Sequence, residues 1–204
     1  MSVPDYTIEA NLPHLAIAGI DEVGRGPWAG PVTAAAVILD PNAIPEKLND
    51  SKKLSEARRE ELARIIHATC KVGIGSASVA EIDEVNIVQA TYLAMRRAVQ
   101  ALPIQPDYVL VDGNRMPQGM PCDGQTLIKG DTRSASIAAA SIVAKVHRDA
   151  YMSDLAADFP AYGWETNRGY GTQKHQVSLL SHGPTLHHRR SFKPIHNMLY
   201  PPKS

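Results

Sequence analysis

Short apolar runs alternate along the chain with longer stretches in which apolar residues recur every three or four positions. The short runs are typical of buried strands, and the longer stretches are typical of helices that pack on a sheet. The predicted strands are residues 15–20, 32–39, 71–79, 108–111 and 126–129. The predicted helices are residues 55–69, 86–102, 134–158 and, more briefly, 172–180. Strands that alternate with helices in this way predict an α/β domain.

The ends of the predicted helices carry residues that typically begin or end a helix. Ser55 and Thr172 are placed to cap two of the helices, and Pro103 ends a third. The run 134–141 (SASIAAAS) contains mostly small side chains, which allow a helix to approach a sheet closely. The eight or so Gly- and Pro-rich residues between the first two strands permit a hairpin.

Composition favours a soluble globular protein. The chain has 204 residues, of which 44% are hydrophobic and 21% charged. This length predicts a single domain over residues 1–204, with an α/β core at about 15–158 and a helical and loop-rich C-terminal extension at about 159–204. No apolar run approaches the length of a membrane span and no secretory signal is apparent, so we expect a cytoplasmic protein.

Two further counts narrow the chemistry. Cys70 and Cys122 have no Cys or His partner at zinc-like spacing, which argues against a disulfide framework or a zinc site. The 21 basic residues balance the 21 acidic ones. A partner with many negative charges would therefore have to be bound by local positive charge or by metal ions.

Three of the predicted strands lead to carboxylates: Asp21 and Glu22 after the first, Asp112 after the fourth and Asp131 after the fifth. In α/β sheets functional groups gather outside strand ends, so these four side chains could converge. Clustered carboxylates raise one another's pKa and need divalent cations to remain ionised together. Oxygen ligands without His or Cys select Mg²⁺ or Mn²⁺. Two such ions are the usual means of phosphodiester hydrolysis.

Each acid also has a structural interpretation. Asp131 precedes a helix and could cap it, Asp112 could begin a turn with Gly113, and Asp21 and Glu22 could be solvated charges at a strand end. Asp149 lies inside the long helix four residues after Lys145, and a pair of these two side chains predicts a structural role for it.

Several motifs resemble the ribonuclease HII family. They are GIDEVGRG at 19–26 followed by Pro27, NDSKKLS at 49–55, the Asp112-Gly113 pair, and KGDTRSASIAAASIVAKVHRD at 129–149. The resemblance extends from about Leu15 to Lys193. It implies a ribonuclease H-like mixed sheet flanked by helices, with a C-terminal portion that embraces the substrate. It also implies that Asp21, Glu22, Asp112 and Asp131 are catalytic and bind two Mg²⁺ or Mn²⁺ ions.

The resemblance further implies which residues contact the substrate. Gly24, Arg25 and Gly26 would recognise the 2′-hydroxyl of a ribonucleotide at an RNA–DNA junction, and Tyr170 would stack on the sugar of the next DNA nucleotide. Basic side chains would bind phosphates rather than read bases. The main candidates are Lys52, Lys53, Arg168, where better-known members carry lysine, and Arg190. Further positive charge lies at Arg115, Lys129, Lys174, Lys193 and the His187–Arg190 cluster. A second interpretation of that cluster is structural, in which it joins the tail to the core.

The implied activity is that of an endonuclease. It would cut the RNA strand of RNA–DNA hybrids, and cut on the 5′ side of single ribonucleotides in duplex DNA, leaving a 5′-phosphate and a 3′-hydroxyl. In this hypothesis Asp21 bridges the two ions, and Glu22, Asp112 and Asp131 complete their ligand shells. The partners are the hybrid and the ribonucleotide-containing duplex, with no membrane and no organic cofactor. We expect a monomer that acts in ribonucleotide removal.

Three alternatives remain open at this stage. The related ribonuclease HIII shares the acids but generally has an extra N-terminal domain, and only about fourteen residues precede the first predicted strand. A catalytically inactive RNA–DNA hybrid-binding module would not need all four acids. A small-molecule phosphohydrolase would need the acids but not the dispersed basic residues.

Overall fold

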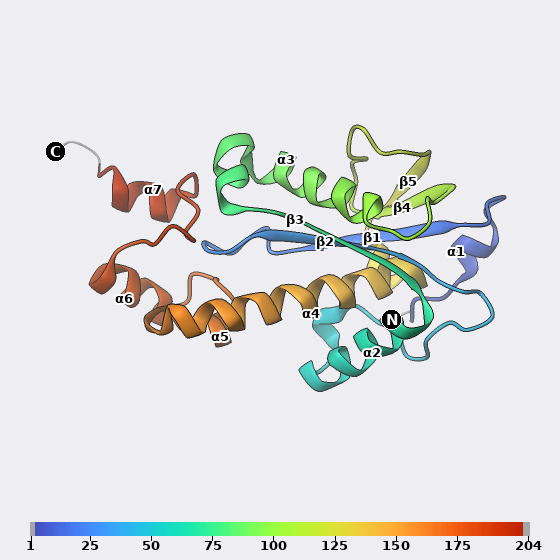
Figure 1. The fold of residues 1–204 in the computed structure, drawn as a ribbon, viewed down its shortest axis with the longest axis horizontal. Coiled ribbons are helices and arrows are strands. Elements are labelled where there is room, and N and C mark those ends of the chain that lie inside the picture. The colour runs from blue at the N-terminus through green and yellow to red at the C-terminus, as the bar shows by residue number, and fades with distance from the viewer. Residues whose placement is uncertain (1–2, 202–204) are drawn as a thin grey trace.

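A computed structural model describes residues 3–201, and the remaining residues of the predicted 1–204 domain lie outside this range. Within the described residues, five strands form one sheet in the order β3-β2-β1-β4-β5 (Figure 1). The strands are β1 (Ile17–Val23), β2 (Val32–Ile38), β3 (Lys71–Ala77), β4 (Tyr108–Asp112) and β5 (Gly124–Leu127). The predicted α/β class is confirmed.

The sheet is mixed, as predicted. The hairpin partner β2 pairs antiparallel with β1, with Asp21 opposite Ala35, and β3 continues antiparallel to β2. On its other side β1 pairs parallel with β4, and β4 pairs parallel with β5. The parallel pairing brings the ends of β1 and β4 to the same edge of the sheet, where their acidic residues lie.

Helices cover both faces of the sheet (Figure 1). On one face lies α3 (Val79–Gln100), which packs on β1, β2 and β3. On the other lie α4 (Ala135–Asp158) and α2 (Glu56–Thr69). Ser55 and Ser134 cap α2 and α4, accepting hydrogen bonds from the main-chain N–H groups of Arg58 and Ile137.

Close contact between α4 and β1 depends on small residues. A Cβ atom added to Gly19 would lie 2.2 Å from the main-chain carbon of Ser136, so only glycine fits there. Every residue of α4 from Ala135 to Ala144 is buried. The small-residue run therefore acts as predicted, by letting the helix lie directly against the strand that carries Asp21.

The first residues also pack on α4. The short helix α1 (Thr7–Ala10) brings Glu9 under the beginning of α4, where its Oε1 accepts from the Ser134 hydroxyl at 2.6 Å and the Ser136 N–H at 3.0 Å. The carboxylate thus satisfies donors at the positive end of the helix.

The C-terminal segment, residues 159–201, packs at one end of α4 (Figure 1). It contains the 3-10 turn η3 (Pro160–Tyr162) and the helices α5 (Trp164–Asn167), α6 (Gln173–His182) and α7 (Lys193–Leu199). Trp164, Tyr162, Leu179 and Ile195 form its core together with Met152 and Leu155 of α4. Thr172 caps α6 and Gly183 follows it, as predicted.

Element boundaries differ from prediction at several places, including β5, which lies two residues earlier than the predicted strand 126–129. Strand β1 continues through both acids to Val23 instead of ending before them. The strand predicted to reach residue 79 stops earlier, because Ser78 forms a capping box with Glu81 and α3 begins at Val79. Asn86, the predicted start of this helix, lies at a kink within it and has φ 68°. Asp131 belongs to the 3-10 turn η2 (Gly130–Thr132) rather than following a strand directly. No helix within residues 3–201 is long and apolar enough to cross a membrane.

Candidate active site

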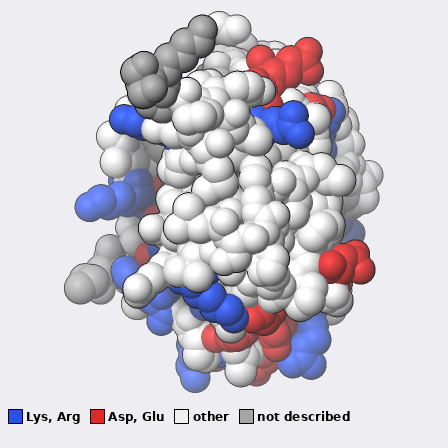
Figure 2. Space-filling model, turned by 90° about the vertical axis from the view of Figure 1, so that its left-hand side faces the viewer, with Lys and Arg blue, Asp and Glu red and all other residues white. Residues whose placement is uncertain are grey.

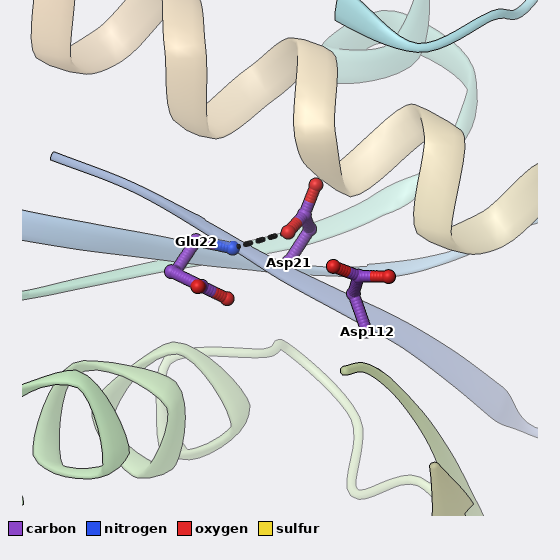
Figure 3. Close-up of side chains that lie close together, drawn as sticks. All are labelled: Asp21, Glu22 and Asp112. Atoms are coloured by element: carbon purple, nitrogen blue, oxygen red, sulfur yellow. Dashed lines mark hydrogen bonds between the residues drawn. The ribbon is translucent and has the colours of Figure 1, made fainter. Parts of the chain in front are cut away.

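Two adjacent acids lie on opposite faces of β1. Side chains alternate along a strand, so Asp21 points toward α4 while Glu22 points toward α3 (Figure 3). The Asp21 Oδ1 atom accepts a hydrogen bond from the N–H of Glu22 at 2.7 Å. Asp21 is buried, with 8% of its surface exposed. One strand thus presents carboxylates to both sides of the sheet edge.

The third acid comes from the neighbouring parallel strand. Asp112 is the last residue of β4, and its Oδ1 atom accepts a hydrogen bond from the N–H of Gly130 at 2.7 Å. Gly130 fits this position because an added Cβ would lie 2.6 Å from the Ile137 Cδ1 atom. The bond joins Asp112 to the turn η2 and so brings Asp131 to the same region.

These acids meet closely enough to share a cation. One carboxylate oxygen from each of Asp21, Glu22 and Asp112 lies within 4.8 Å of the others. Asp131 lines the same cavity, of about 310 Å³, without joining this closest group. A second hollow of about 270 Å³, on the α3 side, also borders Glu22 and Asp112. The carboxylates therefore separate two adjoining hollows.

The negative charges of the clustered carboxylates repel one another. Burial raises the pKa of Asp21 well above its ordinary value, and the carboxylates of Glu22 and Asp112 raise it further. Burial also raises the pKa of Glu22, although Arg25 partly offsets this effect. For Asp131, burial and the charges of Asp50 and Asp112 raise the pKa, while Lys52 and Lys53 lower it.

Such a cluster fits hard divalent cations. Its ligands are oxygen atoms only, which suits Mg²⁺ or Mn²⁺ better than zinc. A cation would also relieve the repulsion that raises these pKa values.

Two of the predicted substrate contacts border the cavity. Lys52 and Lys53 belong to the 3-10 turn η1 (Ser51–Lys53) and are both exposed, and of the two only Lys52 lines the cavity. Tyr170 lines it from the C-terminal segment, with 48% of its surface exposed. The Tyr170 ring also lies beside Gly26, since a Cβ there would be 3.4 Å from its Cε1 atom.

The predicted Gly24-Arg25-Gly26 segment forms the turn directly after β1. Gly24 has φ +91°, a conformation that L side chains rarely adopt. The Arg25 guanidinium donates to Glu22 Oε1 at 3.1 Å, and its side chain is 52% exposed. In the described structure Arg25 therefore pairs with an acid of the cluster, on the side of the second hollow.

Arg168 does not line the cavity of the acids. Its guanidinium binds other residues of the protein, and its phosphate contact stays a prediction. It donates to Glu56 Oε1 at 3.0 Å, to the Asp149 carbonyl at 3.2 Å and to the Ser153 hydroxyl. Arg168 thus fastens the turn before Tyr170 to α2 and α4.

Arg190 and Asp149 have different outcomes. The Arg190 N–H donates to Asp83 at 3.0 Å and the residue is exposed outside both hollows, so its phosphate contact stays a prediction. The predicted pair within α4 is confirmed: Lys145 Nζ lies 2.6 Å from Asp149 Oδ2.

The basic cluster at 187–190 is partly buried. His188 and Arg189 are both 0% exposed. Their burial favours the structural interpretation of the cluster over phosphate binding at the surface. On the face shown in Figure 2, basic and acidic side chains are interspersed near the edges and the middle carries few charges. The basic residues that line the cavity of the acids are Lys52, Lys145 and Arg148.

The sequence interpretation missed three residues of α4 that line the cavity: Ser141, Lys145 and Arg148. They are spaced by four and three positions, which places them on one face of a helix. That spacing, in a helix predicted to follow Asp131, was an available signal.

Comparison with known proteins agrees with this geometry. Residues 18–195 match the family described as Ribonuclease HII. A curated relative, the ribonuclease HII of Ruegeria pomeroyi, is 60% identical over 203 residues, which cover 98% of this chain and 87% of the relative.

Solved structures share the fold. The ribonuclease H2 of Pyrococcus horikoshii has a TM-score of 0.75 at 23% identity, over 90% of this chain and 97% of that one. Bst-RNase HIII, solved in complex with Mn²⁺, has a TM-score of 0.70 at 19% identity, over 93% of this chain and 71% of that one. These similarities indicate a ribonuclease H-like α/β fold. Together with the sequence match, they mean that the chain belongs to the ribonuclease HII family.

Proposed function

We propose that this protein is an endonuclease that hydrolyses the RNA strand of RNA–DNA hybrids and cleaves on the 5′ side of single ribonucleotides in duplex DNA. The products would carry 5′-phosphate and 3′-hydroxyl ends. Membership of the ribonuclease HII family makes the protein a hydrolase of RNA in such hybrids. The observation that carries the proposal is the meeting of Asp21, Glu22 and Asp112 within 4.8 Å, beside a cavity lined by Asp131 and Tyr170.

The acids would hold the metal ions. Asp21, Glu22, Asp112 and Asp131 are the proposed ligands and catalytic residues, and the ions are Mg²⁺ or Mn²⁺. When bound, two such ions supply a hydroxide nucleophile and stabilise the leaving oxygen. Support for manganese comes from Bst-RNase HIII, which was solved with Mn²⁺.

The chain's own residues would orient the substrate. Asp112 is held by the Gly130 N–H, so it needs little reorganisation to bind a cation. Lys52 and Lys53 lie where they lower the pKa of Asp131, and they would bind phosphates at the same edge. Arg25 would exchange its bond with Glu22 for a phosphate when the acids bind cations.

The loop after β1 would recognise the ribonucleotide. The carbonyl groups of Gly24 and Arg25 already accept hydrogen bonds from Arg189. Gly26 has no main-chain hydrogen-bond partner among the described residues. Its N–H and C=O are therefore suited to a 2′-hydroxyl, which both donates and accepts. The Tyr170 ring beside Gly26 would stack on the adjacent deoxyribose.

The inactive hybrid-binding alternative is not favoured, because the chain retains all four carboxylates and places three of them at ligand distance. We propose further that the enzyme acts as a monomer in the cytoplasm, without an organic cofactor, in DNA repair and replication.

Digestion of a duplex that contains one ribonucleotide tests the proposal. With Mg²⁺ or Mn²⁺ we expect one cut on the 5′ side of the ribonucleotide, mapped on a sequencing gel, and no cut in the matched all-DNA duplex. Asp21→Asn should abolish cleavage while hybrid binding remains measurable. Unaltered turnover by that variant would refute the assignment of Asp21.

A further inference from the structure

Two arginines are buried beside the candidate active site without a carboxylate among their hydrogen-bond partners. Arg148 of α4 is 1% exposed and Arg189 of the C-terminal segment is 0% exposed. Every hydrogen bond that their guanidinium groups make with described residues goes to a main-chain carbonyl. This is an unusual environment for a buried charge, which is normally paired.

Arg189 binds four carbonyls of a single loop, residues 24–31, which connects β1 to β2. Its Nε donates to Gly30 at 2.9 Å and its Nη1 to Arg25 at 3.0 Å. Its Nη2 donates to Gly24 at 2.5 Å and to Pro31 at 3.1 Å. One planar group therefore holds both ends of the loop that contains Gly24, Arg25 and Gly26.

Arg148 joins the same loop to the turn that carries Tyr170. Its Nε donates to the Pro31 carbonyl at 2.9 Å and its Nη2 to the Ala29 carbonyl at 3.1 Å. Its Nη1 donates to the Arg168 carbonyl at 3.0 Å, two residues before Tyr170. Arg148 also lines the cavity that contains the acids.

The glycines of the loop fit around Arg148. An added Cβ at Gly24 would lie 2.2 Å from the Arg148 Nε atom, and one at Gly30 would lie 3.3 Å from its Nη2 atom. Gly24 is therefore required by contact with a guanidinium as well as by its backbone conformation.

Burying two positive charges together has a cost. Burial lowers the pKa of Arg189 to about 9, and the charge of Arg148 contributes to the same shift. Burial likewise lowers the pKa of Arg148 to about 10. Apolar side chains of similar volume would often be at least as stable in such positions. The arrangement is better explained by what it fixes in place.

We propose that Arg148 and Arg189 are positioning residues for ribonucleotide recognition. By binding the inward-facing carbonyls of residues 24–31, they fix the main chain at Gly26 and set its distance from Tyr170. With exposures of 1% and 0%, the two side chains would act through the loop rather than by contact with the substrate. The inference rests on the proposed function, since it specifies how that function's recognition loop is held.

The test compares Arg189→Ala and Arg148→Ala with the wild type on the single-ribonucleotide duplex. Misplacement of the loop should lower kcat/KM roughly 10- to 100-fold, mainly through KM. Mn²⁺ affinity, measured by calorimetry without substrate, should stay unchanged because the sheet holds the acids. Millimolar methylguanidinium should restore several-fold activity to Arg189→Ala, whereas ammonium or sodium at equal ionic strength should not.

Arg97→Ala is the matched control, because the Arg97 guanidinium also binds a carbonyl, that of Ser76, but its other partner is Glu81 and it makes no hydrogen bond to residues 24–31 in the described structure. It should lose stability and keep its kcat/KM. Native kcat/KM in both Arg148→Ala and Arg189→Ala would overturn the inference.

Arg189→Lys decides the matter if the alanine variants do not fold. An ammonium group cannot span the four carbonyls, so a folded Arg189→Lys should show raised KM with intact Mn²⁺ binding. Native kinetics in this variant would count against the proposal. A wild type that binds and cuts ribonucleotide and all-DNA duplexes alike would instead refute the proposed function, and the inference with it.

Discussion

The acids and the loop at residues 24–31 lie next to each other, but different parts of the molecule hold them. Asp21, Glu22 and Asp112 belong to paired strands, so the hydrogen bonds of the sheet determine where they lie. The loop is held instead by the C-terminal segment and by Arg148 of α4. Its Trp28 N–H donates to the Gly169 carbonyl at 2.8 Å, and its Gly30 N–H donates to the His187 carbonyl at 2.9 Å.

Different parts of the molecule therefore position the groups proposed for hydrolysis and the groups proposed for substrate recognition. Regular strand pairing sets the positions of the acids, whereas side chains up to 165 positions away in the sequence hold the loop. Damage to the sheet edge should therefore abolish hydrolysis whatever the substrate. Damage to the C-terminal segment should weaken substrate recognition and leave metal binding largely intact.

Among the tests of this comparison, the largest effect is expected of Asp112→Asn. The variant removes one ligand charge and weakens the acceptor for the Gly130 N–H, which helps to hold η2 in place. We expect cleavage to fall by roughly 10²- to 10³-fold or more in single-turnover assays, because the lost group acts on charge in the transition state. Thermal stability without metal should rise slightly, since one of the charges that raises the pKa of Asp21 is gone.

Asp123→Asn is the control for this prediction. Asp123 is exposed and precedes β5, at the opposite end of that strand from η2. It should cleave at the wild-type rate. Equal loss in both variants would show that the effect is not specific to the acid cluster.

Trp164→Ala tests the other region. Trp164 is completely buried in the core of the C-terminal segment, so its removal should cost about 3–5 kcal/mol of unfolding free energy. We expect a raised KM for the single-ribonucleotide duplex, with Mn²⁺ affinity close to that of the wild type. Urea titration and calorimetry measure the two quantities.

Trp164→Phe narrows the cause. It keeps most of the packing but loses the Trp164 Nε1–H bond to His175 at 3.2 Å. A smaller stability loss with native KM would attribute the alanine effect to packing. Loss of Mn²⁺ binding in Trp164→Ala would contradict the separation of the two regions.

The regular part of the fold could be predicted from the sequence. Strands β1, β2 and β4 and helices α2, α4 and α6 follow from apolar spacing and capping residues, because these signals are local. The start of α3 was missed because Ser78 ends one apolar run and caps the next element. Whether Ser78 belongs to the strand or caps the helix is decided by its hydrogen bonds with Glu81, which are visible only in the structure.

The candidate site divides in the same way. Acids on neighbouring parallel strands could be expected to meet, since strand ends share an edge. The internal role of Arg168 could not, because its partners Glu56 and Ser153 are distant in sequence and its φ of 51° directs the turn. Nor could sequence distinguish buried Arg189 from exposed Arg190, since adjacent arginines look alike until the chain is folded.

The next prediction concerns the pH dependence of stability, which should depend on a buried histidine of the C-terminal segment, His188. His188 is buried, and its Nδ1 accepts the Thr185 N–H at 2.9 Å, so the proton lies on Nε2, 3.0 Å from the His175 Nε2 atom. His175 in turn lies with Nδ1 2.9 Å from the Tyr170 carbonyl, to which it donates. Burial lowers the pKa of His188 to about 3, and the neighbouring His175 adds to this shift.

The sign follows from proton binding. Because the pKa of His188 is lower in the folded than in the unfolded protein, its contribution to stability is complete above about pH 6.5 and falls as the pH decreases toward 3. His188→Gln should remove up to about 1.4 kcal/mol per pH unit from the slope of unfolding free energy between pH 6.5 and 5. The acids titrate in both proteins, so their effect cancels in the difference.

His182→Gln provides the reference, since His182 is an exposed histidine of the same segment. The slope measured for His188→Gln is compared with the slope of this variant. If the slope of unfolding free energy against pH were the same in His188→Gln and the wild type, the prediction that burial disfavours protonation of His188 would be wrong.

The smallest expected effects come from two helix caps that should cost the same stability but differ in function. Ser55 caps α2, accepting from the Arg58 N–H at 3.3 Å, and Thr172 caps α6, accepting from the His175 N–H at 3.4 Å. Replacement of either by alanine should cost about 1 kcal/mol. Thr172 also donates its own N–H to the Tyr170 carbonyl at 2.8 Å, so its loop includes the residue that faces the substrate.

We therefore expect Thr172→Ala to raise KM for the single-ribonucleotide duplex a few-fold, while Ser55→Ala leaves KM unchanged at equal loss of stability. Steady-state kinetics alongside urea titration of both variants measures this. If the two variants had the same KM, loosening the helix behind Tyr170 would not affect recognition, and the C-terminal segment would hold the loop through its arginine contacts alone.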